Sequence, residues 1–176
     1  IPILIAGIAA CVSFRAGMFN AGIEGAIWLG GIAATLMGVY FKLPSFLHIP
    51  LCLVVAGIVG GIWCLIPGIA KVKYQVNEVV FGLMLNSIAI YIVQYVVLYI
   101  FLDKARLAYS FTEAETQYIQ HSAELPWLNK TYQLSSGLLI AIGLAILLHF
   151  LLKNSKWGYE NKISGLNIIF ARFSGM

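Results

Sequence analysis

Charged residues are missing from three long stretches of the sequence. Residues 25–41, 43–70 and 79–102 contain no Asp, Glu, Lys or Arg. A helix needs about 20 apolar residues to cross a hydrocarbon core of about 30 Å. The second and third stretches are long enough by themselves, and the first is long enough once residues 20–24 are added. Residues 134–152 form a fourth candidate, interrupted only by His149, and residues 1–12 match the end of a fifth helix. The pattern predicts an all-α polytopic bundle of transmembrane helices.

The composition supports a membrane protein. Of the 176 residues, 61% are hydrophobic and 10% are charged, and the mean hydropathy is +0.90. Soluble domains are only about 45–50% apolar, so a soluble protein is excluded. We expect residues 1–176 to form one transmembrane domain within a longer polytopic protein, because the first helix lacks its start. No signal peptide is recognised.

The basic residues predict an orientation. One short loop contains Lys71 and Lys73, and the segment after the last helix contains Lys153, Lys156, Lys162 and Arg172. By the positive-inside rule both segments lie in the cytoplasm, so residues 103–133 form an extracytoplasmic loop. Counting the crossings backwards places Lys42 outside and Arg15 inside. A re-entrant segment after Arg15 stays open as an alternative.

No pattern typical of a catalytic or metal site is present. The cysteines, which we expect to be small core hydrophobes, are Cys11, Cys52 and Cys64, and the histidines are His48, His121 and His149. These residues are far apart, and the motifs HExxH, GxSxG and GxxxxGK[ST] do not occur. The net charge of +4 comes from scattered residues. We therefore expect no enzyme activity in this chain, no metal, no cofactor and no nucleic-acid partner.

Small and aromatic residues predict helix contacts and membrane anchors. Gly57 and Gly61 form a GxxxG pattern, and Ala26 and Gly30 have the same spacing, which lets helices approach closely in lipid. The tryptophans fall near predicted helix ends or loops, at Trp28, Trp63, Trp127 and Trp157. We interpret most of them as anchors at the membrane interface.

Several segments resemble one family, in the same order along the chain. They are FNAGIEG (19–25), KVKYQVNEVV (71–80), MLNSIA (84–89), LP (125–126) and KNSKWGY (153–159). They are similar to segments of the permease subunits of bacterial ABC importers for simple sugars, branched-chain amino acids and nucleosides. Within this class, the nucleoside-type permeases are most similar. That subgroup usually has Gln after the EG pair, where this chain has Ala26.

The resemblance implies a membrane-spanning permease subunit of an ATP-driven importer, embedded in the lipid of a bacterial cell membrane. It implies nucleosides as the cargo, with simple sugars as the alternative. It also implies an ABC ATPase subunit, a second permease subunit and an extracytoplasmic substrate-binding (lipo)protein as partners. From the residues alone, an ion-coupled secondary transporter and a non-transporting scaffold stay open, because Glu24 is an acid embedded in a span.

Glu24 has two interpretations. A charged residue inside a membrane costs about 2.5–3.5 kcal/mol on insertion scales, so Glu24 should face the bundle, a cavity or a polar partner. In the functional interpretation, Asn20 and Glu24 lie on one helical face and offer an amide and a carboxylate to a polar substrate. In the structural interpretation, which is slightly favoured, Glu24 lies at a helix start, caps backbone donors and fixes a glycine-rich bend.

Polar residues at the start of the 79–102 span and within it have similar alternatives. Asn77 is expected to cap this helix and Glu78 to complement its dipole, rather than to form a gate. Asn86, Ser87 and Gln94 lie inside the span, where side-chain amides need partners on another helix. Asn86 is a candidate for lining the substrate path.

The tail, residues 157–176, resembles the segment that forms the cytoplasmic coupling helix in this family. The candidate coupling residues are Tyr159, Lys162, Gly165, Asn167, Phe170 and Arg172. Asn161, Ile168 and Phe170 stand where the family usually has Leu, Pro and Ala. From the residues, we expect a short helix over 167–173, capped by Asn167, with Ile169, Phe170 and Phe173 on one apolar face. This face could rest on lipid headgroups, whereas the resemblance implies a groove in the ATPase.

Overall fold

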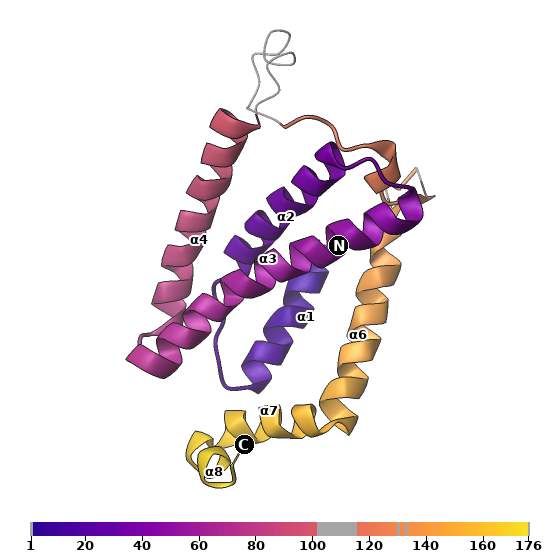
Figure 1. Ribbon diagram of the computed structural model, residues 1–176. Helices are drawn as coiled ribbons and strands as arrows, with labels where there is room; N and C mark the ends of the chain where they lie inside the picture. Colours follow the sequence, from indigo (N-terminus) through magenta and orange to yellow (C-terminus); the bar gives the residue numbers. More distant parts are fainter. Residues whose placement is uncertain (1, 102–115, 130, 133, 176) are drawn as a thin grey trace.

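The computed structural model describes residues 2–101, 116–129, 131–132 and 134–175, and in this part of the chain it is an all-α bundle with one short hairpin (Figure 1). The elements are α1 (Pro2–Arg15), α2 (Ile23–Tyr40), α3 (Ser45–Tyr74), α4 (Glu78–Tyr95) with its π-helical extension η1 (Val96–Ile100), the 3-10 helix η2 (His121–Ala123), strands β1 (Trp127–Asn129) and β2 (Leu134–Ser135), α6 (Gly137–Asn154), α7 (Lys156–Leu166) and α8 (Ile168–Phe173). Four helices are long and apolar enough to cross a membrane: Ile23–Tyr40, Ser45–Tyr74, Glu78–Ile100 and Gly137–Asn154. The predicted fold class is confirmed.

Three predicted boundaries are wrong. Residues 20–22 are not helical, so α2 starts at Ile23. Residues 134–135 pair with β1 as an antiparallel strand, so the last span starts at Gly137. Lys71 and Lys73 lie in the last turn of α3 rather than in a loop. Gln75, with φ 53°, ends α3, and the Asn77 side chain then caps α4 as predicted, accepting from the backbone N–H groups of Val79 and Val80.

The helices pack around α2, which contacts α1, α3 and α4. A Cβ added to Gly30 would lie 3.0 Å from the Ala56 carbonyl oxygen, and one added to Gly60 would lie 3.2 Å from the Ala26 carbonyl oxygen. The predicted contact through Ala26 and Gly30 is therefore confirmed. The GxxxG pattern makes no such contact among the described residues, where an added Cβ at Gly57 or Gly61 meets nothing within 4 Å. Helix α3 instead turns Ala56 and Gly60 toward α2.

The cysteines and Pro67 differ in how far they are buried in the bundle. All three cysteines are free. Cys52 is buried and Cys64 is partly buried, as expected for core positions, whereas Cys11 is exposed on α1. Pro67 is buried inside α3, which continues as a helix to Tyr74.

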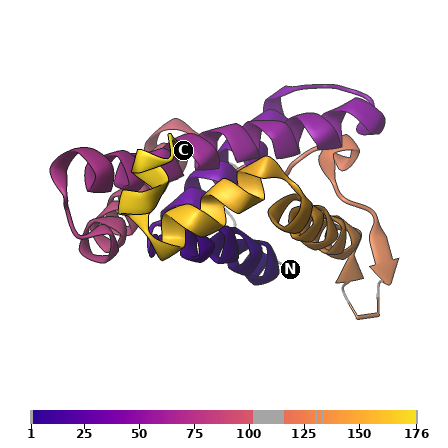
Figure 2. The ribbon, with the colours of Figure 1, turned by 90° about the horizontal axis from the view of Figure 1, so that it is seen from below.

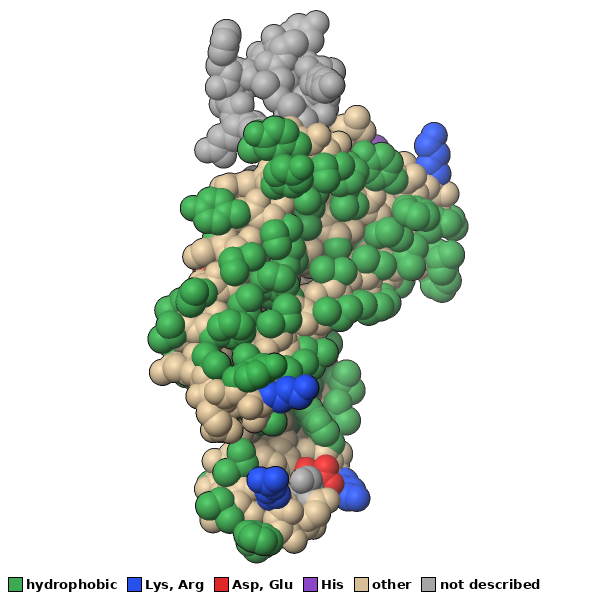
Figure 3. All heavy atoms as spheres, turned by 60° about the vertical axis from the view of Figure 1, so that its left-hand side comes forward, with side chains coloured by type: hydrophobic (Ala, Val, Ile, Leu, Met, Phe, Trp, Pro, Cys, Tyr) green, Lys and Arg blue, Asp and Glu red, His purple; other side chains and the backbone are tan. Residues whose placement is uncertain are grey.

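The two ends of the bundle differ in charge. Arg15, at the end of α1, donates from Nη2 to the Leu152 carbonyl oxygen at 3.0 Å, so the ends of α1 and α6 meet. Helices α7 and α8 lie across this same end (Figures 1 and 2). The last turn of α3, with its two lysines, is also here. The structure thus gathers at one end most of the basic residues that we expect in the cytoplasm. A space-filling view shows hydrophobic side chains over the middle of one face and Lys and Arg side chains toward its ends (Figure 3).

The opposite end is closed by part of the expected extracytoplasmic loop. His48 at the start of α3 is fully buried, and its Nδ1 lies 2.8 Å from the Ser122 Oγ and its Nε2 lies 3.1 Å from the Met37 carbonyl oxygen. Gln120 donates from Nε2 to the Val39 carbonyl oxygen at 3.1 Å. The segment around η2 is therefore bonded to the ends of α2 and α3. Residues 103–115, 130 and 133 of that loop lie outside the described residues.

Candidate functional site

The connection between α1 and α2 reaches far into the bundle before α2 begins. Residues 16–22 are not helical. The backbone N–H of Gly25 donates to the Asn86 Oδ1 at 2.9 Å, and Asn86 lies about two turns, or about 12 Å, past the first residue of α4. The first turn of α2 is therefore at membrane depth. The segment after Arg15 therefore enters the bundle from the basic end as non-helical chain, as in the re-entrant alternative, and α2 begins only inside the bundle.

Side chains of α3 and α4 bind the part of this connection that is nearest the basic end, residues 17–19. Lys71 Nζ donates to the Glu78 Oε1 at 2.5 Å and to the Gly17 carbonyl oxygen at 3.3 Å. The same Glu78 oxygen accepts from the Phe19 backbone N–H at 3.4 Å. The ion pair therefore contacts both ends of residues 17–19. Glu78 was expected only to complement the dipole of α4, and sequence reasoning missed this second role because its partners are about 60 residues away along the chain.

Asn86 binds the part of the connection that lies deepest in the bundle, next to the start of α2. Its side-chain Nδ2 donates to the Ala21 carbonyl oxygen at 2.8 Å, and its Oδ1 accepts from the Gly25 N–H. Only 5% of the residue is exposed. The amide thus has partners on another element, as expected for an amide inside a span. These bonds satisfy backbone groups that lipid could not satisfy.

The glycines around Glu24 are explained by close approach. A Cβ on Gly82 would lie 2.8 Å from the Gly22 backbone nitrogen, and a Cβ on Gly25 would lie 2.7 Å from the Trp63 Nε1. Gly17 has a φ of +74°, a backbone conformation that residues other than Gly rarely adopt. The connection can run against α3 and α4 only because these positions lack side chains.

Glu24 lies in the first turn of α2, and its side chain is exposed. The cap position is Gly22, and no side chain caps the helix, so the predicted capping by Glu24 is wrong. Asn20 precedes the helix, so the two residues do not share one helical face. Within the described residues Glu24 makes no hydrogen bond or ion pair. Its carboxylate therefore points away from the packed side of its own chain at membrane depth.

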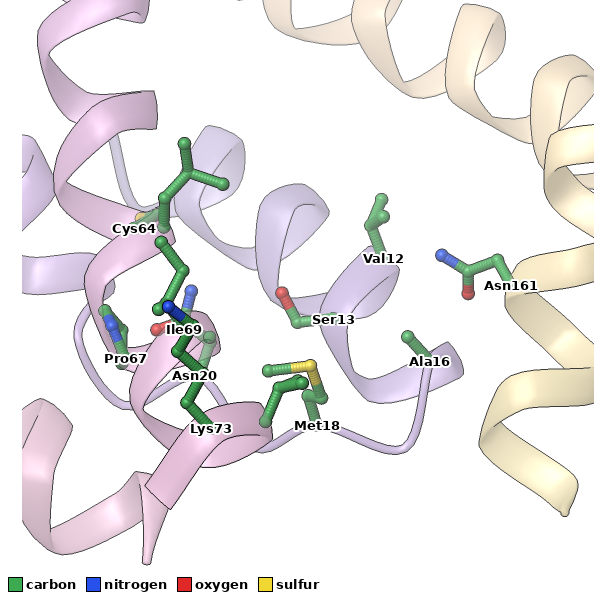
Figure 4. A pocket seen from close by; sticks show the side chains of 13 residues that line it. Val12, Ser13, Ala16, Met18, Asn20, Cys64, Pro67, Ile69, Lys73 and Asn161 are labelled. Atoms are coloured by element: carbon green, nitrogen blue, oxygen red, sulfur yellow. The ribbon is translucent and has the colours of Figure 1, made fainter. Parts of the chain in front are cut away.

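Asn20 lines a cavity of about 590 Å³ between α1, α3 and α7 (Figure 4). Its Oδ1 also accepts from the Gly22 N–H at 3.0 Å. Other polar lining residues are Ser13, Lys73 and Asn161, and neither Glu24 nor Asn86 is among the lining residues. The Asn161 Oδ1 is buried and has no hydrogen-bond partner among the described residues. The structure thus places the three candidate path residues in different surroundings. Asn20 lines the cavity, Glu24 is exposed, and Asn86 is buried and bonded to the backbone before and within α2.

The tail forms two short helices, of which α7 was not predicted. Ser155 caps α7 by accepting from the Gly158 N–H at 3.1 Å. Asn167 caps α8 as predicted, accepting from the Phe170 N–H at 3.0 Å. Ile169, Phe170 and Phe173 are exposed, while Ala171 is buried. The described residues thus leave the predicted apolar face of α8 uncovered.

Gly165 links α7 to the connection. A Cβ added to Gly165 would overlap the Arg15 carbonyl oxygen and would lie 3.0 Å from the Gly17 nitrogen. The other candidate coupling residues, Tyr159, Lys162, Asn167, Phe170 and Arg172, are exposed. Gly165 therefore lies against the connection that leads into the membrane-spanning part.

Comparisons with known proteins identify the family. The family model described as "Branched-chain amino acid transport system / permease component" matches residues 1–176. A guanosine ABC transporter permease protein of Bacillus subtilis is 32% identical over 99% of this chain and 49% of its own length. A glucose ABC transporter permease protein of Haloferax volcanii is 28% identical over 100% of this chain and 48% of its own length. A nucleoside ABC transporter permease protein of Lactococcus lactis is 25% identical over 99% of this chain and 49% of its own length.

No solved structure matches the chain. The chain spans about half the length of the curated relatives it matches. The resemblance drawn from the sequence motifs is confirmed over the whole chain, and it covers both nucleoside and sugar permeases. The chain belongs to the family of branched-chain amino acid transport system permease components and is part of an integral membrane protein.

Proposed function

We propose that the chain forms part of the membrane-spanning permease subunit of an ATP-driven importer, and that the importer carries nucleosides. The observation that carries this proposal is the non-helical connection of residues 16–22, which lies at membrane depth and leads to an exposed carboxylate. Irregular backbone at this depth is tolerated only where protein buries it or where it lines a water-filled cavity. Transporters use such broken helices to bind substrates near the middle of the membrane.

Asn20 and Glu24 are the side chains that we assign to the substrate path. Asn20 lines the cavity at the basic end, and Glu24, four residues further along the chain, is exposed in the first turn of α2. An exposed carboxylate inside a span is unfavourable against lipid, so Glu24 needs water, a substrate or a polar partner. Asn86 acts on the path by positioning residues 21–25, because both ends of its amide bond their backbone.

The relatives support nucleosides as the cargo. Two of them are named as guanosine and nucleoside permeases, and a third is named as a glucose permease. The glucose relative supports a simple sugar as the alternative cargo. An ion-coupled mechanism would also use acids inside the spans. Within the described spans the acids are Glu24 and Glu78, and Glu78 is the first residue of its helix, so the support for ion coupling is limited to Glu24.

The surfaces that this chain leaves uncovered suit three partners. The exposed apolar face of α8 suits a groove in the ATPase subunit. On α4, Ser87, Tyr91 and Gln94 are exposed on the side opposite the buried Asn86 and Ala89, which suits a second permease subunit better than lipid. At the other end, exposed Trp127 and Leu128 suit a substrate-binding (lipo)protein.

Uptake in cells tests the cargo. Cells that lack the full-length protein should lose uptake of labelled guanosine, while uptake of labelled glucose and ribose continues. Re-expression of the full-length protein should restore guanosine uptake. Loss of glucose or ribose uptake with unchanged guanosine uptake would replace the nucleoside proposal with the sugar alternative.

A further inference from the structure

A second open space lies beside α2, away from the cavity that Asn20 lines. This groove has a volume of about 620 Å³, and its lining includes Trp28, Gly31 and Thr35 of α2, Val93 of α4, and Gln117 and Tyr118 of the segment before η2. Small-molecule sites usually have volumes of about 300–1,000 Å³. The groove therefore has the size of a site for one small molecule.

Trp28 lies near the middle of the membrane, not at its interface. It follows Gly25 by about one helical turn, and Gly25 is bonded to Asn86 about 12 Å from the start of α4. The span that begins at Glu78 has 23 residues, or about 35 Å, so Trp28 lies about halfway along it. Because aromatic anchors gather at the membrane surfaces, we infer that Trp28 has another role than interfacial anchoring.

The Trp28 side chain is available to a ligand. The residue is 48% exposed, and within the described residues its indole N–H makes no hydrogen bond. Gly31 lies one turn further along the same face, where an added Cβ would meet nothing within 4 Å. The space beside the indole ring is therefore open.

Polar groups continue this face of α2 in both directions. Glu24, Trp28, Gly31 and Thr35 follow the spacing i, i+4, i+7 and i+11, which places them along one side of the helix. The Thr35 hydroxyl donates to the Gly31 carbonyl oxygen at 2.9 Å, so its oxygen can still accept. The face thus presents a carboxylate, a large aromatic ring and a hydroxyl in succession, with the exposed Gln117 nearby in the groove.

We propose that this face of α2 is a binding site for a nucleoside, with the Trp28 ring stacking on the base. A flat heteroaromatic base stacks on an indole ring, and the Glu24 carboxylate accepts hydrogen bonds from N–H groups of the base or from ribose hydroxyls. The Thr35 hydroxyl offers a further acceptor toward the other end of the ligand. The proposal rests on the proposed import of nucleosides and names the residues that select them.

Substitutions at Trp28 test this site in the full-length permease, assembled with its partner subunits in proteoliposomes. Uptake of labelled guanosine, divided by the amount of permease, should fall about tenfold or more in Trp28→Ala, since loss of base stacking on an aromatic ring has effects of this order. It should stay within about threefold of the unmutated protein in Trp28→Phe, which keeps an aromatic face. Phe150→Ala removes an exposed aromatic side chain from α6, outside the groove, and is the matched control.

Protection from alkylation gives a second test that does not depend on turnover. In a full-length protein from which every native cysteine has been removed, with Cys11, Cys52 and Cys64 replaced by Ser, Thr35→Cys places one thiol in the groove. Guanosine should slow its reaction with a water-soluble maleimide, whereas Tyr132→Cys at the exposed hairpin should react at the same rate with and without guanosine.

Two results would overturn the site: unchanged guanosine uptake per permease in Trp28→Ala, or no protection of Thr35→Cys by guanosine. If Trp28→Ala does not reach the membrane, the protection experiment decides alone. A complete lack of guanosine uptake by the unmutated transporter would instead reject the proposed function, and this failure is recognised without any substitution.

Discussion

At the scale of single residues, the side-chain amide of Asn86 forms hydrogen bonds with backbone groups at the start of α2, as a capping side chain does at a helix end. It bonds one carbonyl oxygen and one N–H that would otherwise be unpaired inside the membrane. A buried backbone group without a partner costs about 1–3 kcal/mol. Glu24 lies between these two bonded residues, Ala21 and Gly25, in the first turn of α2, and it has no such partner among the described residues. The two polar residues therefore have different physical roles.

Their substitutions should separate these roles. Asn86→Leu leaves the Ala21 carbonyl and the Gly25 N–H unpaired, so we expect a lower melting temperature in detergent and a loss of uptake that follows the loss of folded protein. Glu24→Gln removes only a charge from an exposed position. We expect near-normal abundance and thermal stability with at least fivefold lower nucleoside uptake per permease. Equal losses of abundance and uptake for Glu24→Gln would return Glu24 to the structural interpretation.

Sequence reasoning singled out Asn20, Glu24 and Asn86 as candidates but did not predict their arrangement. Its signals were the unusual residue types, a carboxylate and amides inside apolar runs, and these also indicated Asn86 as a buried amide with partners. Hydrophobicity does not show where a helix starts within an apolar run, so Asn20 was placed on the same helix as Glu24. The contacts of Lys71, Glu78 and Asn86 with residues 17–25 join distant parts of the chain, and no local pattern contains them.

At the scale of elements, α7 contacts the connection that leads to Glu24. Gly165 of α7 lies against Arg15 and Gly17, and Lys71 bonds the same Gly17 from α3. Movement of α7 would therefore displace residues 15–17, which are continuous with the proposed substrate path. Sequence reasoning predicted the cap and the apolar face of α8, but it missed α7 because this segment is polar and lacks a clear apolar period.

Two substitutions in the tail test coupling to the ATPase. Gly165→Ala adds a Cβ that would overlap the Arg15 carbonyl oxygen, so α7 must shift. We expect the assembled transporter to keep its ATPase activity, with at least fivefold less nucleoside transported per ATP hydrolysed. Phe170→Asp places a charge on the uncovered face of α8 and should weaken co-purification of the ATPase. Lys156→Ala, whose side chain is 91% exposed, is the control. Normal coupling in Gly165→Ala and normal co-purification of Phe170→Asp would exclude this role for the tail.

At the scale of the whole molecule, the charge-free stretches predicted the helices correctly because burial in lipid requires long apolar segments. The pairing of helices was less predictable. Ala26 and Gly30 do lie at the contact between α2 and α3, whereas Gly57 and Gly61 do not. Spacing alone cannot show which side of α3 faces α2. The gathering of α7, α8, Arg15 and the last turn of α3 at one end agrees with the charge-based orientation, which labelling can test directly.

Two cysteines on opposite ends of the bundle give the sharpest test of orientation. In a full-length protein without any native cysteine, Tyr132→Cys lies on the hairpin, where Tyr132 is 74% exposed, and Lys156→Cys lies at the start of α7. Neither change removes a buried contact, and Ser155 is avoided because its Oγ caps α7. Because the basic end is expected in the cytoplasm, an impermeant maleimide added to intact cells should label Tyr132→Cys and leave Lys156→Cys unlabelled until the membrane is permeabilised. The reverse pattern would invert the permease and place α8 on the wrong side of the membrane for an ATPase, so it would reject the importer proposal together with the orientation.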